Sequence, residues 1–352
     1  MDLREKYITL NRSFKPVLIY HVGIDAGFFT EYTSMVNAML YCLENHIQFK
    51  LYSADANFGY RNGWSDYFAP FCDEVAESFN HRYNRHPAPS WKRIIREAWC
   101  KKQPNLLKWK IKTVIFRKIG AYKARRIYGP HTLLTHQIPF NPCKTFHIPE
   151  LGIEGDYIHA FQQISQVAWK LNADLQQETL RLALSLNLPQ TYAGIQVRGG
   201  DKVTEVRLLP SAYYAQIATE KLHASDVFVL TDDYTLFSQL QQAAPSVRWY
   251  TLCTPQEKGY VNSQFTQTRG NRKLEQMTRF LASMEILMHA SVYAGSIAPG
   301  PSLFLLKRMY PAIHPTDCSM ELLSHAVTLP VAGRGKLAEE YLARKKDSLS
   351  DA

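Results

Sequence analysis

The alternation of hydrophobic and polar positions predicts an α/β domain over residues 1–187. The apolar run 17–22 ends near two glycines and indicates a buried strand. Apolar residues at helical spacing follow over 30–45, and 47–52 alternates as a second strand. This βαβ opening is typical of an α/β domain.

A second α/β series is predicted over residues 188–332. The predicted strands are 192–197, 226–231, 247–252 and 291–294, and the predicted helices are 211–222, 234–243, 274–290 and 302–309. Such alternation predicts a doubly wound parallel sheet, a Rossmann-like domain that binds ligands at the carboxyl ends of its strands. A charged tail, 333–352, follows and is predicted to be helical in part.

The composition agrees with two folded domains. The 352 residues exceed what one hydrophobic core usually serves, and 46% of them are hydrophobic while 20% are charged. No run reaches the roughly 18 apolar residues of a membrane span, and the charged start does not resemble a signal peptide. The six cysteines form no CxxC pair, which disfavours zinc and disulfides. We therefore expect a cytoplasmic protein with reduced thiols.

Positive charge is concentrated in one segment, residues 90–126, which holds thirteen Lys and Arg against Glu97. This segment alone has a net charge of +12, whereas the whole chain has +10. The other residues therefore sum to −2. Its cations alternate with apolar residues such as Trp99 and Trp109, which suits a helix on an anionic inner-membrane surface. A solvated basic face or a groove for an acidic acceptor are the alternatives. Nucleic-acid binding is disfavoured because no binding module is recognisable.

An aromatic loop over residues 57–71 is a second candidate surface. Its rings include Phe58, Tyr60, Trp64, Tyr67 and Phe68. Such rings either stack on a sugar or cap a hydrophobic core, and the sequence leaves both interpretations open.

Chemistry-bearing residues recur at the ends of three predicted strands of the second series. These segments are Gly194-Ile-Gln-Val-Arg-Gly-Gly-Asp-Lys-Val-Thr-Glu205, Thr231-Asp232-Asp233, and Gly295-Ser296 with Pro299-Gly300-Pro301-Ser302. An arginine can form bidentate hydrogen bonds to a pyrophosphate. Glycines let the backbone approach a phosphate closely, and the N-terminus of a helix capped by serine attracts anions. Two alternatives remain, an Arg198–Asp201 ion pair and a helix cap at Thr231-Asp232-Asp233. Dinucleotide and P-loop fingerprints are missing from the sequence.

Residues 197–205, 229–233 and 280–309 resemble the three conserved regions of the GDP-fucose-using superfamily, which includes α1,6-fucosyltransferases and rhizobial nodulation enzymes. The resemblance implies a GT-B fold, in which two Rossmann-like domains face each other across a cleft. It also implies GDP-fucose binding in the C-terminal domain, catalysis without a metal or cofactor, and inversion at the anomeric carbon.

The same resemblance assigns roles to individual residues. Arg198 stabilises the β-phosphate of the leaving GDP, Lys202 assists, and Glu205 is the general base. The donor-binding residues are Gln196, Arg198, Gly199, Gly200, Asp201, Thr231, Asp232, Asp233, Glu285, Ser296 and Ser302. Gly199 stands where many α1,6 enzymes carry a second arginine. This departure motivates the alternative of a non-catalytic membrane- or polyanion-binding protein built on a degenerate GT-B scaffold.

The loop after the first strand supplies acceptor-side candidates. His21, Asp25 and Glu31 are possible proton acceptors there, although a single histidine on a strand is also typical of a packed core. The sequence thus predicts an inverting, metal-independent glycosyltransferase of polysaccharide biosynthesis. It transfers fucose from GDP-fucose to a saccharide, for instance a lipid-linked or lipopolysaccharide acceptor, and associates peripherally with the inner membrane.

Overall fold

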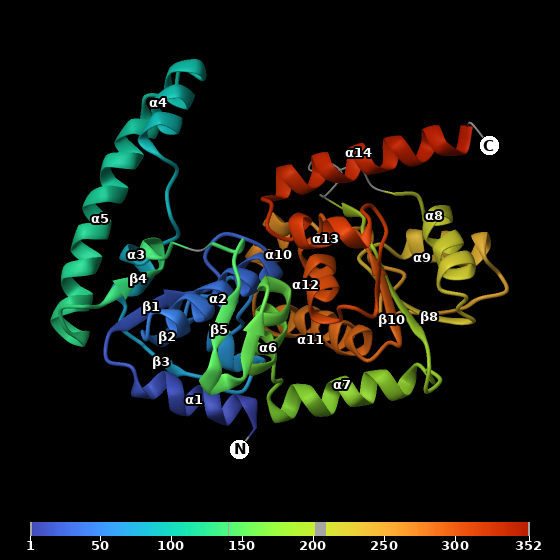
Figure 1. The fold of residues 1–352 in the computed structure, drawn as a ribbon, viewed down its shortest axis with the longest axis horizontal. Coiled ribbons are helices and arrows are strands. Elements are labelled where there is room, and N and C mark those ends of the chain that lie inside the picture. The colour runs from blue at the N-terminus through green and yellow to red at the C-terminus, as the bar shows by residue number, and fades with distance from the viewer. Residues whose placement is uncertain (1, 140, 201–208, 351–352) are drawn as a thin grey trace. The chain divides into compact units, whose positions relative to one another are not determined.

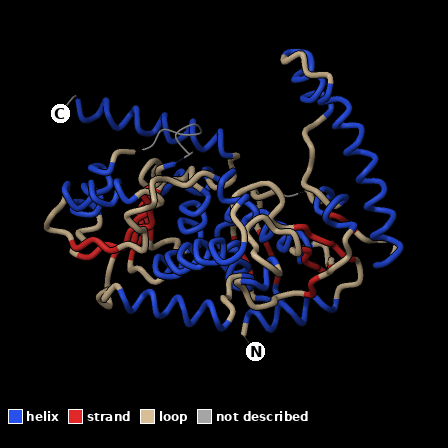
Figure 2. The backbone as a smooth tube through the Cα atoms, turned by 180° about the vertical axis from the view of Figure 1, so that it is seen from behind, coloured by secondary structure: helices blue, strands red, loops and turns tan. Residues whose placement is uncertain are grey.

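The fold is described from a computed structural model over residues 2–139, 141–200 and 209–350, with the side chains of 345–350 excluded. The chain divides into two compact units (Figure 1). The first comprises Met1–Asp156 and Gln163–Lys170, and the second comprises Tyr157–Gln162 and Leu171–Ala352. Each unit contains a parallel sheet bordered by helices (Figure 2).

The first sheet has the order β3-β2-β1-β4, and all its described pairings are parallel. Its strands are β1 (Val17–His21), β2 (Gln48–Tyr52), β3 (Asp73–Glu74) and β4 (Leu133–Leu134). Every residue of β1 is buried, as its apolar run predicts. The unit also contains α1 (Leu3–Ser13), α2 (Phe28–Glu44), α3 (Phe79–Tyr83) and a hairpin of β5 (Phe146–Ile148) and β6 (Ile153–Gly155).

The basic segment folds into two helices that pack on each other, α4 (Trp91–Cys100) and α5 (Asn105–Tyr128) (Figure 1). Ser90 caps α4 by accepting a hydrogen bond from the Arg93 N–H. The pair is joined to the rest of the unit through the side of α5 that contacts α3 and β4.

The aromatic loop belongs to the hydrophobic core. Phe58, Trp64, Tyr67 and Phe68 are at most 1% exposed, and the Trp64 and Phe68 rings stack at 4.3 Å. Burying such rings stabilises the fold by about 1.5–3 kcal/mol each. The interpretation of these four rings as a sugar-stacking surface is therefore wrong, and the core-capping alternative holds.

The second sheet has the order β11-β10-β7-β8-β9 with parallel pairing throughout. Its strands are β7 (Ala193–Val197), β8 (Asp226–Thr231), β9 (Arg248–Tyr250), β10 (Val292–Gly295) and β11 (Ile313–Pro315). In chain order this is 3-2-1-4-5, the doubly wound arrangement, so the predicted fold class is confirmed. The order reverses between β7 and β10, where such folds bind ligands.

Helices of the second unit follow the predicted alternation. They are α7 (Ala173–Ser185), α8 (Ser211–Gln216) with the π-helical turn Ile217–Lys221, α9 (Tyr234–Ala243), α10 (Asn262–Gln267), α11 (Gly270–Met288), α12 (Gly300–Arg308), α13 (Met320–Ala326) and α14 (Val331–Ser350). α6 (Tyr157–Ala168) is shared between the two units.

The division between the units differs from the predicted boundary at residue 187. α7 packs along α11, so it belongs to the second unit. The main segment of that unit begins at Leu171. The periodicity of α7 indicated a helix but did not indicate which sheet it covers. Residues 333–350 of the expected tail belong to the longer helix α14.

Candidate functional site

Predicted site residues lie on both sides of the switch point, the position between β7 and β10 where the strand order reverses. Arg198 follows β7, and Ser296 follows β10, so both lie at the carboxyl edge of neighbouring strands. The structure thus brings together the ends of two strands that are about a hundred residues apart in sequence.

Asp232, just after β8, fixes the loop that carries Arg198. Its Oδ2 accepts hydrogen bonds from Arg198 Nη1 at 2.5 Å and from the Tyr260 N–H at 2.8 Å. Its Oδ1 accepts one from the Gly199 N–H at 2.8 Å. The Arg198 and Asp232 side chains are each 15% exposed, and the guanidinium lies 5.0 Å from the centre of the Tyr260 ring. Asp232 therefore anchors the cation, a role that differs from direct donor contact.

A close backbone approach explains the glycine at position 200. Its φ is +61°, and a Cβ there would lie 2.3 Å from the Tyr260 carbonyl oxygen. The glycine therefore admits the close approach of the Tyr260 backbone, whereas the predicted approach to a phosphate stays a prediction. Asp201, Lys202 and Glu205 lie outside the described residues.

Gln196 is a buried polar side chain whose amide oxygen is unsatisfied within the described part of the chain. It is 5% exposed, and its Oε1 has no hydrogen-bond partner among the described residues. Its neighbours Ile195 and Val197 belong to the core that contains side chains of α8 and α9, so Gln196 points to the other face of β7. A buried acceptor of this kind calls for a donor from water or a ligand, which keeps Gln196 a ligand-binding candidate.

Thr231 and Asp233 serve the backbone. Asp233 Oδ1 caps α9 by accepting from the Thr235 N–H at 2.8 Å, and Thr231 Oγ1 accepts from the Asp233 N–H at 3.2 Å. The helix-cap alternative is therefore correct for this pair. Their assignment to donor binding stays a prediction beside this structural role.

The turn after β10 is organised by Asp317, which sequence reasoning missed. Ser296 Oγ donates to Asp317 Oδ2, and the Ile297 N–H donates to Asp317 Oδ1 at 2.9 Å. Burial raises the pKa of Asp317. The two hydrogen bonds act to lower that pKa, but burial outweighs them. The strand before it, β11, was also missed because it is short and ends in proline.

The predicted anion site at the start of α12 is weaker than its sequence suggests. Ser302 is 1% exposed, and its Oγ accepts from the Tyr293 hydroxyl at 2.8 Å, so it belongs to the core. Pro299 and Pro301 remove two N–H donors from the start of the helix. Glu285 is half-buried on α11, and its assignment to the nucleobase remains a prediction.

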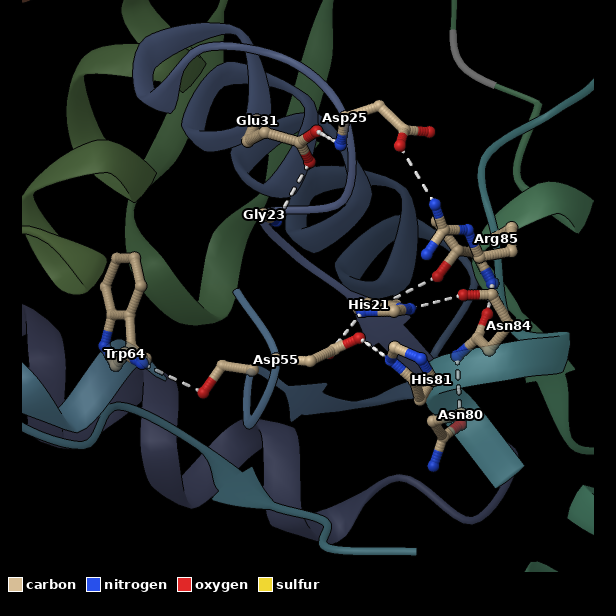
Figure 3. A network of polar contacts seen from close by, with 12 residues as sticks. His21, Gly23, Asp25, Glu31, Asp55, Trp64, Asn80, His81, Asn84 and Arg85 are labelled. Carbon is tan, nitrogen blue, oxygen red and sulfur yellow. Dashed lines mark hydrogen bonds and ion pairs between the residues drawn. The ribbon is translucent and has the colours of Figure 1, made fainter. Parts of the chain in front are cut away.

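In the first unit, Glu31 holds the loop after β1 (Figure 3). Its carboxylate accepts from the N–H groups of Gly23, Asp25 and Ala26 at 3.0–3.2 Å and contacts His86 Nε2 at 2.8 Å. Burial raises the pKa of Glu31, but His86 and the loop amides outweigh it and leave the pKa lowered. These contacts give Glu31 a structural role in the loop, and its assignment to the acceptor side stays a prediction.

Asp25 and His21 differ in environment. The Asp25 side chain is 72% exposed and pairs with Arg85 at 2.9 Å. His21, at the carboxyl end of β1, is fully buried, yet both ring nitrogens have polar partners, Asn84 and Asp55. The packed-core interpretation is thus right about burial but misses the polar network.

Asp55 and His81 complete this network, and neither was a candidate from the sequence. Asp55 follows β2 by three residues, so the strand-end rule that selected Asp232 would also have selected it. His81 lies on the short helix α3 and has no comparable sequence signal.

Two further observations concern metal-binding clusters and membrane-spanning helices. No cluster of three or more residues suited to a metal is found in residues 2–139, 141–200 and 209–350. Within the same part of the chain, no helix has the length and apolar character needed to span a membrane.

Comparison with known proteins gives similarities to solved structures. No family model matches the chain, and no curated protein sequence matches it. The α1,6-fucosyltransferase NodZ soaked with GDP-fucose is 12% identical, with 87% of this chain and 96% of that chain covered and a TM-score of 0.48. Fucosyltransferase NodZ from Bradyrhizobium is 13% identical over 86% and 96%, with a TM-score of 0.48. POFUT1 in complex with GDP is 12% identical over 86% and 98%, with a TM-score of 0.45.

Proposed function

We propose that this chain is a glycosyltransferase that binds GDP-fucose at the carboxyl edge of the second sheet and transfers fucose to a saccharide acceptor with inversion. One observation carries the proposal: Arg198 is fixed by Asp232 beside the switch point of a doubly wound sheet. The motifs of residues 197–205 and 229–233 support GDP-fucose as the donor.

The chemistry of the leaving group fits this arrangement. Transfer breaks the bond between the sugar and the diphosphate, and negative charge develops on the β-phosphate of GDP. A cation already held in place stabilises that charge without reorganisation, and removing one such donor costs roughly 3–4 kcal/mol in known enzymes. Asp232 and the Tyr260 ring supply the positioning for Arg198. Lys202 and Glu205 keep the roles that the resemblance implies.

We expect Arg198→Ala to weaken GDP-fucose binding by roughly 10- to 100-fold, because it removes a charge-assisted hydrogen bond to the diphosphate. Calorimetric titration with GDP, GDP-fucose, GDP-mannose and UDP-sugars measures this. Arg248→Ala is the matched control, since Arg248 also pairs with an aspartate, Asp226, but at the amino ends of β9 and β8. If wild-type protein binds none of these nucleotides, or if Arg198→Ala binds normally, the proposed donor site is wrong.

We further propose that α4 and α5 dock on an anionic lipid surface, where a lipid-linked acceptor would be met. On α4, Trp91, Ile95 and Trp99 recur every fourth residue and are 44%, 54% and 86% exposed. The adjacent face of α4 is buried through Ile94 and Ala98. The exposed stripe is therefore a continuous apolar face on one side of the helix.

α5 presents the same combination of groups. Ile111, Ile115 and Tyr122 are each at least 50% exposed and share one helical face. Exposed cations flank this stripe on both sides, namely Lys108, Lys112, Lys118, Arg125 and Arg126. Apolar residues with flanking Lys and Arg suit the lipid headgroup boundary, where each cation contributes about 1 kcal/mol.

Replacing Lys108, Lys112, Lys118 and Arg125 with glutamine is expected to lower partitioning onto anionic vesicles by at least about 100-fold. Flotation with phosphatidylglycerol-containing and pure phosphatidylcholine vesicles measures the change. Neutralising four exposed cations of the second unit, Lys221, Arg248, Arg272 and Lys336, is the control of equal charge. Equal binding of both variants would contradict the docking face. Vesicle binding without any nucleotide binding would favour the non-catalytic alternative.

A further inference from the structure

Residues 84–90, termed the strap, link α3 to α4 without forming a helix or a strand (Figure 1). Pro87 and Pro89 each have a fixed φ and restrict the preceding residue to extended conformations, so the strap is stiff. It belongs to the first unit, as do α4, α5 and the loop after β1, residues 22–27. A stiff segment can transmit a displacement between the elements that hold its two ends.

Asn84 fastens the first end of the strap to the sheet (Figure 3). Its Nδ2 donates to the Ile19 carbonyl at 2.9 Å, its Oδ1 accepts from the Thr135 N–H at 2.9 Å, and its carbonyl accepts from His21 Nδ1 at 2.6 Å. Asn84 is fully buried. The strap therefore begins at a fixed point between β1 and β4, where the order of this sheet reverses.

The next two residues connect the strap to the loop after β1. Arg85 Nη2 donates to Asp25 Oδ1 at 2.9 Å. His86 Nε2 lies 2.8 Å from Glu31 Oε2, and the Glu31 carboxylate also accepts hydrogen bonds from three N–H groups of that loop. The position of the loop therefore depends on the position of the strap, because the same carboxylate holds both.

The last part of the strap is held by α5. Arg117 Nη2 donates to the His86 carbonyl at 3.1 Å. Lys110 Nζ donates to the Pro89 carbonyl and lies 5.6 Å from the centre of the Trp91 ring on α4. Lys110 and Arg117 are two helical turns apart in sequence, so they lie on the same side of α5. This side of the helix therefore binds the strap at two points.

These two cations differ from the other cations of α5. Lys110 is 5% exposed and Arg117 is half-buried, whereas Lys108, Lys112 and Lys118 are exposed. The exposed cations flank the apolar stripe proposed to meet lipid, and the two inner cations hold the strap by its carbonyl groups. One helix thus connects the proposed lipid face with the loop at the carboxyl end of β1.

We propose that the strap couples docking of α4 and α5 on anionic lipid to the order of the loop after β1. This inference rests on the proposed lipid docking. Lipid headgroups immobilise the two helices, so Lys110 and Arg117 hold the strap more firmly, and His86 in turn holds Glu31 more firmly. The loop amides that Glu31 binds then open less often. Coupling between two sites of one protein typically changes an equilibrium by a factor of about 5–150.

Hydrogen–deuterium exchange of the full chain measures this coupling in peptides that contain residues 22–27. We expect vesicles containing phosphatidylglycerol to slow exchange of the loop amides by at least about 5-fold. Pure phosphatidylcholine vesicles should leave the exchange rate unchanged, because they lack the negative charge that attracts α5. Flotation of the same samples measures how much protein is bound.

Replacing the two inner cations separates coupling through the strap from direct shielding of the loop by lipid. Lys110→Met and Arg117→Met lose the hydrogen-bond donor to the strap but keep an apolar stem, so vesicles should bind them without slowing the loop. Lys101→Met is the matched control, because it loses the same charge from an exposed side chain at the end of α4. This control should keep the slowing seen in the wild type.

Glu31→Gln provides a second test at the other end of the strap. Coupling is reciprocal, so a loop that is held less firmly must weaken docking. The substitution removes a negative charge, which by itself would strengthen attraction to an anionic surface. We expect this variant, measured well below its unfolding midpoint, to bind phosphatidylglycerol vesicles about 5-fold more weakly than the wild type. Equal or tighter binding would overturn the coupling.

The exchange experiment also separates the coupling from the docking on which it rests. If wild-type protein binds the vesicles but its loop exchanges at an unchanged rate, the coupling is overturned. It is equally overturned if Lys110→Met and Arg117→Met bind vesicles and keep the full slowing, because lipid then shields the loop directly. If the wild type binds no vesicles, the proposed docking itself fails, and the coupling falls with it.

Discussion

Replacing Glu31 with glutamine is expected to destabilise the first unit by about 3 kcal/mol at pH 7, because it removes a buried charge with polar partners. The carboxylate accepts three loop amides and contacts His86, and its side chain is fully buried. Glutamine offers one acceptor oxygen, so its NH₂ group would face donors on the other side. Thermal unfolding should show a midpoint lowered by about 6–12 °C for a unit of this size.

The pH dependence of this loss has a definite sign. The pKa of Glu31 is lowered in the folded protein, so its stabilisation is present above the unfolded value of about 4.3. It disappears as pH falls through the lower folded pKa. The difference between wild type and Glu31→Gln should therefore be greatest near neutral pH and shrink below about pH 4. Asp25→Asn, in the same loop but 72% exposed, should change stability by less than about 1 kcal/mol. An equal effect of both substitutions would contradict the buried role of Glu31.

The fold was predictable where its elements carry strong periodicity. Strands such as β1, β7 and β8 are buried along their whole length, so their continuous apolar runs are visible in sequence. β3, β4 and β11 have only two or three residues, too few to show any period. The unit to which α7 belongs depends on packing against α11, which a helical pattern does not encode.

The candidate site was predictable in location but less so in role. Strand ends marked Arg198, Asp232 and Ser296 correctly as neighbours of the carboxyl edge. Hydrogen bonding then decided what each does: Asp232 anchors Arg198, and Ser296 bonds to Asp317. Partners such as Asp317 and Tyr260 come from distant segments without a motif, so only the folded chain reveals them. The same holds for His81 beside Asp55.

Asp232→Asn tests the anchor of the proposed donor site, and two opposed effects decide its result. Losing the carboxylate frees the charge of Arg198, which alone would strengthen attraction to a diphosphate. It also places an NH₂ group against Arg198 or the Gly199 and Tyr260 amides, all of which are donors. Because both side chains are only 15% exposed, the lost pairing costs about 3 kcal/mol. This cost exceeds the attraction to the diphosphate that a freed but poorly oriented Arg198 gains.

We therefore expect Asp232→Asn to destabilise the second unit by about 3 kcal/mol and to weaken GDP-fucose binding by about tenfold or more. Denaturant unfolding and calorimetric titration measure the two effects. Asp233→Asn is the matched control, because the neighbouring carboxylate caps α9 and asparagine caps a helix equally well. Tighter binding by Asp232→Asn would mean that the carboxylate competes with the diphosphate for Arg198. Unchanged stability and affinity would mean that Asp232 does not anchor Arg198 at all.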